Sequence, residues 1–178
     1  MYGLEISGTW LVTDNLRSIV SYSYNNTEIT SDAFFSDLTY GDRDDDNSVV
    51  PENISGNELT LTPKNKGALS LIYTWPTSIG HFTASGTASY TDERYFDLFN
   101  EDSEDSYTRV DLQASWTSPE GRYKILSVVT NATDAEVYNT ADCLANIGAV
   151  QGTPGFIIRC GGNPIDQRLW EVQFMLQL

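Results

Sequence analysis

Long apolar runs and basic residues are what this 178-residue sequence most clearly lacks. No stretch of about 18 apolar residues occurs, which excludes a transmembrane helix. Ten basic residues against 25 acidic ones give a net charge of −15, so nucleic acid is excluded as a partner because nothing could neutralise its phosphates. The first residues also lack the basic and apolar regions of a signal peptide, so we expect any export signal to lie upstream.

Residues that carry chemistry are scarce as well. His81 is the only histidine, so a Ser-His-Asp hydrolase site would have to use it, and no G-x-S-x-G elbow occurs to present the serine. Cys143 and Cys160 are spaced neither for a zinc site nor for a CxxC redox pair. We therefore expect no catalytic residue, no metal site and no cofactor.

What the sequence has instead is alternation of apolar and polar residues with a period of two. It runs through residues 168–178 to the very end of the chain, and such a period over ten residues indicates a long strand. No stretch has a convincing helical period, and β-branched and aromatic residues dominate the periodic segments. Strands are expected at 3–12, 16–27, 58–75, 80–95, 107–117, 122–133 and 168–178.

The connections between these strands alternate in length. The short ones, at 13–15, 76–80 and 118–122, contain turn residues. The long ones fall within 28–57, 92–106 and 139–166, and these three stretches hold 17 of the 25 acidic residues and only three basic ones. In an antiparallel up-and-down sheet, all short turns would lie at one end and all acidic loops at the other.

The acidic loops leave several roles open. Asp42, Asp44 and Asp46 match the first, third and fifth positions of a calcium loop, but Asn47 and Asn53 replace the glycine and glutamate that the pattern needs. A solvated loop is the preferred interpretation, with weaker cation binding as the alternative. The loops could repel like-charged surface groups, bind divalent cations or attract a cationic cargo.

The tryptophans indicate what the apolar face touches. Trp10, Trp75 and Trp116 precede the three short turns, whereas Trp170 and several tyrosines lie near the long loops. Two bands of amphipathic rings around an apolar middle are typical of a bilayer-facing surface. A soluble β-sandwich also alternates, but it has no reason to gather tryptophans at one end. We expect an all-β fold: an antiparallel up-and-down transmembrane β-barrel segment with short periplasmic turns and long extracellular loops.

An ordered set of motifs carries a family resemblance. They are GNELTLTPK (56–64), GALSLIYTW (67–75), ASYTDERYFD (88–97), SYTRVDLQASW (106–116) and TNATDAEVYN (130–139). With the alternating last strand, this set resembles the C-terminal part of a TonB-dependent outer-membrane receptor. The resemblance implies that the segment marked by Asn131, Asp134 and Tyr138 leaves the membrane before the last long loop.

The resemblance also implies that the last strand carries the signal read by the barrel-assembly machinery. Its alternating residues are Trp170, Val172, Phe174, Leu176 and Leu178. Family members usually end in Phe or Trp, so the terminal leucine departs from the pattern.

The implied function is active uptake of a scarce nutrient such as an iron-siderophore, a cobalamin or a glycan. Energy would come from TonB with ExbB and ExbD, acting on an N-terminal plug that this sequence lacks. Family barrels have roughly 22 strands, so about seven strands over residues 1–178 are expected to be the C-terminal part of a barrel. An adhesin or structural barrel, a barrel hydrolase and a soluble β-sandwich binding module are the alternative functions.

Two sets of residues are expected on opposite faces of the sheet. Facing outer-membrane lipid we place Phe82, Ala84, Ala88, Val110, Leu112, Val172, Phe174 and Leu176. Facing the lumen we place Thr83, Ser85, Thr87, Arg109, Asp111 and Gln113, with Arg109 and Asp111 available to lumen partners such as the plug.

A disulfide between Cys143 and Cys160 is the default for a protein exported to an oxidising compartment. It would tether the last long loop, and two free thiols are the alternative.

Overall fold

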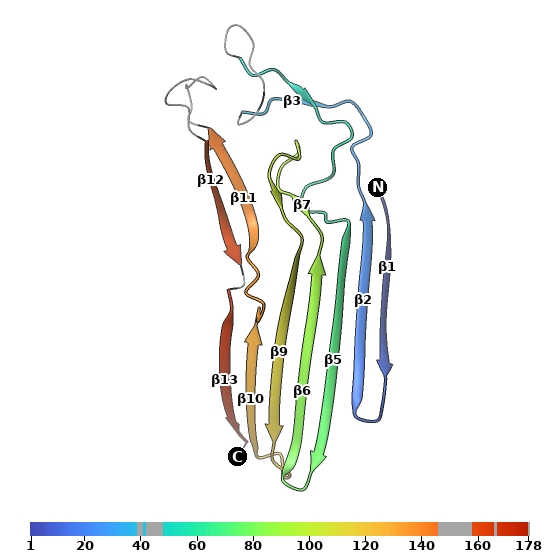
Figure 1. Ribbon diagram of the computed structural model, residues 1–178, viewed down its shortest axis with the longest axis vertical. Coiled ribbons are helices and arrows are strands. Elements are labelled where there is room, and N and C mark those ends of the chain that lie inside the picture. Colours follow the sequence, from blue (N-terminus) through green and yellow to red (C-terminus); the bar gives the residue numbers. More distant parts are fainter. Residues whose placement is uncertain (39–40, 42–47, 146–157, 166, 178) are drawn as a thin grey trace.

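Seven long strands form one antiparallel sheet in the computed structural model of the chain (Figure 1). The structure describes residues 1–38, 41, 48–145, 158–165 and 167–177. The order across the sheet is β1-β2-β5-β6-β9-β10-β13, so each strand lies beside the long strand that precedes it in the chain. The strands are β1 (Tyr2–Leu11), β2 (Leu16–Asn26), β5 (Asn65–Thr77), β6 (Gly80–Thr91), β9 (Tyr107–Thr117), β10 (Tyr123–Thr130) and β13 (Leu169–Leu176).

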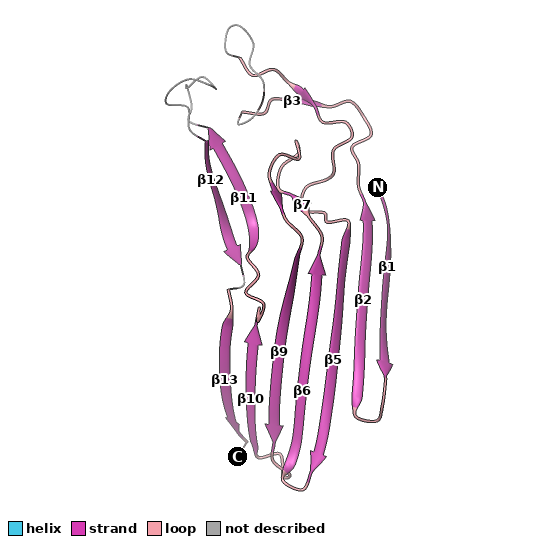
Figure 2. Cartoon of the chain, in the orientation of Figure 1, coloured by secondary structure: helices cyan, strands magenta, loops and turns pink. Residues whose placement is uncertain are grey.

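Short strand pairs occupy the long connections. They are β3 (Phe34–Phe35) with β4 (Glu52–Asn53), β7 (Arg94–Tyr95) with β8 (Ser103–Glu104), and β11 (Val137–Ala145) with β12 (Ile158–Ile165). Figure 2 shows only strands and loops in the described part of the chain, where no helix is long and apolar enough to cross a membrane. The expected all-β, antiparallel fold is therefore confirmed.

The two ends of the sheet differ as the connection lengths predict. Tight turns at 12–15, 78–79 and 118–122 lie at the lower end in Figure 1, and the long connections lie at the upper end. Gly80 begins β6 with φ of 126°, and a Cβ there would lie 2.2 Å from the carbonyl oxygen of Thr117. Only glycine fits such a position, since side chains disfavour positive φ and no space exists for one.

The register defines two faces, because residues paired across an antiparallel ladder point to the same side. One row on the first face runs through Trp75, Phe82, Trp116, Ile125 and Phe174. On the opposite face Thr74 pairs with Thr83 and Ser70 with Thr87, whose hydroxyls lie 2.8 Å apart. Strand alternation thus separates an apolar face from a polar face across the whole sheet.

The apolar face has no protein layer against it among the described residues. Leu112 is 46% exposed in mid-strand and Phe174 is 76% exposed, and the buried apolar side chains in the described part of the chain are only Ile54, Val129 and Val137. A sandwich would bury this face against a second sheet. The exposed rows instead form an apolar surface of the kind that a barrel presents to lipid.

Three strand ends differ from the sequence-based prediction by three residues or more. The strand expected at 58–75 begins at Asn65, and the one expected at 80–95 ends at Thr91. Leu61 has φ of 55°, a left-handed conformation that interrupts a strand. The strand expected at 122–133 ends at Thr130 because Asn131 has φ of 49°.

The β11–β12 hairpin was not predicted. Its sequence, VYNTADCLA followed by IRCGGNPI, mixes small and polar residues without a clear period of two. The sequence pattern therefore did not indicate this pairing. The two strands form an antiparallel ladder with an irregularity between Tyr138 and Thr140.

Candidate functional site

The polar face carries all six residues expected in the lumen. Across β6 and β9, Thr83 pairs with Ser115, Ser85 with Gln113, and Thr87 with Asp111. The residues expected to face lipid lie on the opposite face in the same ladders. That the polar face lines a lumen stays a prediction.

Arg109 and Asp111 form an ion pair with each other, two residues apart on β9. Arg109 Nε lies 3.0 Å from Asp111 Oδ1. The same oxygen accepts a hydrogen bond from the backbone N–H of Asn131, at 2.8 Å. Asp111 therefore ties β9 to the residue that ends β10, a role that the sequence did not reveal.

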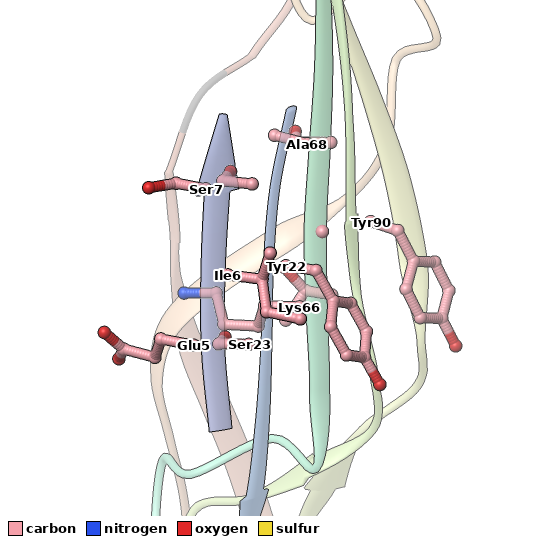
Figure 3. Close-up of a pocket in the computed structure, with 12 residues that line it drawn as sticks. Glu5, Ile6, Ser7, Tyr22, Ser23, Lys66, Ala68 and Tyr90 are labelled. Carbon is pink, nitrogen blue, oxygen red and sulfur yellow. The ribbon is translucent and has the colours of Figure 1, made fainter. Parts of the chain in front are cut away.

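A hollow of about 520 Å³ lies on the sheet near the loop end, across β1, β2, β5 and β6 (Figure 3). Glu5, Ser23 and Lys66 occupy one row of the polar face there, and Ser7 lies in the next row. In Figure 3, Glu5 and Ser7 extend to the left, whereas the rings of Tyr22 and Tyr90 extend to the right. The hollow offers hydroxyl groups, one acid and one base, which suit polar contacts and not covalent chemistry.

Tyrosines mark the loop end of the apolar face. The hydroxyl of Tyr22 donates to Asn65 Oδ1 at 2.7 Å, and that of Tyr90 donates to Asp92 Oδ1 at 3.1 Å. The amide of Asn65 also donates to Asp92 at 2.7 Å, and this hydrogen bond is the main cause of a lowered pKa of Asp92. Rings on an apolar surface with hydroxyls anchored to polar groups are what a membrane interface favours.

The second long loop, residues 92–106, is hydrogen-bonded to the first. The side chain of Asn100 accepts from the backbone N–H of Glu58 at 2.7 Å and donates to its carbonyl oxygen at 3.1 Å. Asn57 donates to the carbonyl of Leu98 at 2.9 Å. These contacts join two connections that are about 40 residues apart in the sequence.

A single carboxylate shapes the tip of the second loop. Asp97 accepts hydrogen bonds from the backbone N–H groups of Phe99 and Asp102, both at 2.6 Å. Nearby, burial raises the pKa of Glu101, and the charges of Asp37 and Asp97 raise it further. Carboxylates from the first and second loops therefore lie close enough to repel one another.

On its other side the second loop holds the β11 strand. Arg94 Nε donates to Glu104 Oε2 at 2.7 Å, and its side chain and that of Glu104 are only 16% and 5% exposed. Arg94 also donates to the carbonyl of Tyr138, and the N–H of Tyr138 donates to Glu104 Oε1 at 2.6 Å. We call this arrangement of Arg94, Glu104 and the Tyr138 backbone the clamp. Sequence reasoning missed it, although Arg94 is the only basic residue of the acidic stretch 92–106.

The Asn131, Asp134, Tyr138 motif now has a structural account. Asn131 is 1% exposed, and its side chain bonds both backbone polar groups of Ala135, at 2.8 and 2.9 Å. Asp134 pairs with Arg168, immediately before β13, and the backbone of Tyr138 enters the clamp. The motif therefore turns the chain out of β10 and fixes where the last hairpin starts.

Three basic side chains at the loop end form ion pairs within the protein. Among the described residues there, Lys64 pairs with Glu58, Arg94 with Glu104 and Arg168 with Asp134. The hydrogen bond to Glu58 raises the pKa of Lys64. Since the three acidic stretches contain 17 acids and three bases, this end of the molecule is strongly negative.

Several predicted features lie outside the described residues or remain untested. The Asp42, Asp44 and Asp46 loop and Leu178 are outside them, and no metal-binding group of acids, His or Cys occurs within them. Trp170, Val172, Phe174 and Leu176 lie on the apolar face of β13, and their role in assembly stays a prediction. His81 lies beside Thr117 at the short-turn end.

The two cysteines are directly opposite each other in the β11–β12 ladder. Opposed residues of an antiparallel pair have Cα atoms about 4.5–5.5 Å apart. A disulfide needs Cα atoms about 4.4–6.8 Å apart. The register of Cys143 and Cys160 is thus compatible with the disulfide, which stays a prediction.

Solved structures share this fold. The siderophore receptor PiuA of Acinetobacter baumannii superposes with a TM-score of 0.67 at 18% identity, over 96% of this chain and 20% of its own. The ferric yersiniabactin uptake receptor FyuA of Yersinia pestis gives 0.65 at 14%, over 96% and 22%. The ferric preacinetobactin receptor BauA of A. baumannii gives 0.58 at 16%, over 97% and 21%. The chain spans about a fifth of the length of these receptors.

Sequence comparison identifies the family directly. No curated protein matches the chain. The profile of TonB dependent receptor-like β-barrels matches residues 1–139, which is most of the sequence and covers β1 to the start of β11. The chain belongs to the TonB-dependent receptor β-barrel family, whose members are receptors of the outer membrane.

Proposed function

We propose that residues 1–178 are the C-terminal part of an integral outer-membrane receptor that takes up a ferric siderophore with energy from TonB. The observation that carries the proposal is the exposed apolar face of a seven-stranded sheet whose acidic loops all lie at one end. That sheet superposes over nearly its whole length on three receptors named for siderophores or their ferric complexes.

The open edges of the sheet support the proposal that the chain is a part of a larger barrel. β1 and β13 each have a long-strand neighbour on one side only. Unpaired backbone groups are very costly in lipid, so a spanning sheet must close on itself. Further strands would complete the barrel, and a plug inside it would contact the polar face and TonB. The barrel-assembly machinery and outer-membrane lipid are the other proposed partners.

Transport is favoured over the two alternative functions of a barrel. The family and the three similar structures are receptors rather than enzymes. A hydrolase would have to use His81, which lies at the short-turn end of the sheet, opposite the long loops. For an adhesin or a purely structural barrel, we find no feature of the described residues that favours it over a receptor.

Iron uptake by whole cells tests the proposal. The gene for the full-length protein is deleted from its host and restored on a plasmid, in strains with and without TonB. Radiolabelled iron is offered as a panel of ferric siderophores under iron limitation. Receptor-dependent uptake that disappears without TonB is the expected result. Uptake that is unchanged by deletion of the gene, for every chelate in the panel, would refute the proposed function.

A further inference from the structure

A second cavity, of about 490 Å³, lies between the second long loop and the β11–β12 hairpin. Its lining combines aromatic rings with carboxylates, together with serine hydroxyls and the backbone of two glycines. The rings belong to Phe96, Tyr107 and Tyr138, and the carboxylates to Glu104, Asp105 and Glu136. Residues from β7–β8, β9 and β11–β12 thus meet around one space.

The clamp forms a wall of this cavity and fixes its shape. Glu104 belongs both to the lining and to the clamp, and its charge is matched by Arg94. The guanidinium of Arg94 also lies 5.8 Å from the centre of the Phe96 ring. The hairpin is held to the second loop through Tyr138, so the space between them is defined by partly buried hydrogen bonds.

The unmatched charge of the cavity is negative. Asp105 and Glu136 have exposed side chains, and none of the described residues that line the space is basic. Elsewhere at the loop end, Lys64 pairs with Glu58 and Arg168 with Asp134, and Lys66 on β5 lies in a row with Glu5. An anionic group entering here would be repelled, whereas a cation would gain from the carboxylates and from the faces of the rings.

We propose that this cavity binds a positively charged group of the cargo, such as an ammonium, with Asp105 and Glu136 as its contacting residues. Arg94 and Glu104 are positioning residues that hold the hairpin in place. The inference rests on the proposed function, because it takes the cargo to be a ferric chelate. Beyond that function, the inference specifies that the receptor selects a cargo with a positively charged group.

Three probes with the same iron core test the inference on the full-length receptor in detergent. They are a ferric linear trihydroxamate with a free terminal ammonium, the same complex acetylated at that amine, and the same complex succinylated there. Equilibrium binding measures the affinity of each. We expect the ammonium form to bind roughly three- to tenfold more tightly than the acetylated form, and the succinylated form to bind most weakly.

Charge-neutral variants locate the preference. Asp105→Asn with Glu136→Gln should bring the affinities of the ammonium and acetylated forms within about twofold of each other. Glu28→Gln is the matched control, since Glu28 is exposed on the first loop and lies outside the cavity. An equal loss of preference in the control would overturn the inference, because selection would then come from the overall field of the loops.

The outcomes separate this inference from the proposed function. Equal affinities for the three probes, a preference for the succinylated form, or no binding of any of them would overturn the cavity inference. Uptake of radiolabelled iron in whole cells is read independently. The receptor could instead take up an anionic chelate, for example a ferric tricatecholate, in preference to the ammonium probe. That result would agree with the proposed function and refute the inferred preference for a positively charged cargo.

Discussion

Asn131 is the most completely buried of the described side chains, and it holds the turn that ends β10. Its amide bonds Ala135 twice, its N–H donates to Asp111, and its carbonyl accepts from the N–H of Asp134. Its φ of 49° is a conformation that asparagine adopts more readily than most residues. One side chain thus replaces the ladder bonds that the turn interrupts.

We expect Asn131→Ala to destabilise the full-length barrel by about 1–3 kcal/mol, since partly buried backbone groups of Ala135 lose their partners. The midpoint of urea unfolding in detergent or lipid vesicles measures the loss. Asn15→Ala, in the exposed first turn, is the control and should leave the midpoint unchanged. Equal midpoints for wild type and Asn131→Ala would contradict this role.

The clamp gives a second prediction for single residues. Removing either partner of the largely buried Arg94–Glu104 pair should cost about 3–5 kcal/mol, because the other charge is left unmatched. Arg94→Lys should not rescue the pair, since Arg94 uses two nitrogens in different directions and lysine has one.

Hydrogen exchange checks the clamp directly. The amide of Tyr138, which donates to Glu104, should lose protection in Arg94→Met and Glu104→Gln, while amides at the short-turn end of β5 and β6 keep theirs. Unchanged protection of Tyr138 in both variants would show that the clamp does not hold β11.

At the scale of strands, the two faces of the sheet are the feature that substitution tests best. Leu112 and Gln113 are neighbours on β9 that point to opposite faces. Leu112→Arg should impair barrel assembly, because an arginine at the middle of the bilayer costs roughly 2–4 kcal/mol. Gln113→Arg should be tolerated. Heat-modifiable migration on gels reports the folded fraction, and equal damage from the two substitutions would reverse the facing assignment.

The last hairpin carries the disulfide prediction. Cys143 and Cys160 should be linked, which in the chain-entropy model stabilises a loop of this size by about 3 kcal/mol. Mass spectrometry of the full-length protein, with and without reduction, should find the linked peptides only before reduction. Two alkylatable thiols in freshly isolated membranes would exclude the bond.

Strand positions and faces could be predicted from the sequence, because alternation is a local pattern and the polarity of each residue indicates which face of the sheet it occupies. Phe82 and Thr83 show this, as neighbours that fall on opposite faces in the expected sense. The loop contacts could not be predicted. Asn100 bonds Glu58 across 42 residues, and Arg94 reaches Tyr138 across 44, so both depend on how three loops fold together. Leu61 stopped a strand that alternation alone would have continued.

At the scale of the whole molecule, charge and hydrophobicity are separated along and across the sheet. The acidic loops lie at one end, the row containing Trp75, Phe82 and Trp116 lies at the other, and exposed apolar side chains cover one face between them. Water does not favour such a face, and the edges of β1 and β13 would pair with other chains if left open. Both properties are explained if the sheet is one arc of a closed barrel in a membrane.

Size-exclusion chromatography combined with circular dichroism, on residues 1–178 alone, tests this central claim most directly. In plain buffer the account predicts aggregation, and in detergent it predicts a β-rich species of mixed size, because seven strands expose two edges and an apolar face. A sharp monomeric peak that melts cooperatively in plain buffer would contradict the account. The apolar face would then be covered by the protein itself, and the proposal that the chain is part of a membrane receptor would have to be abandoned.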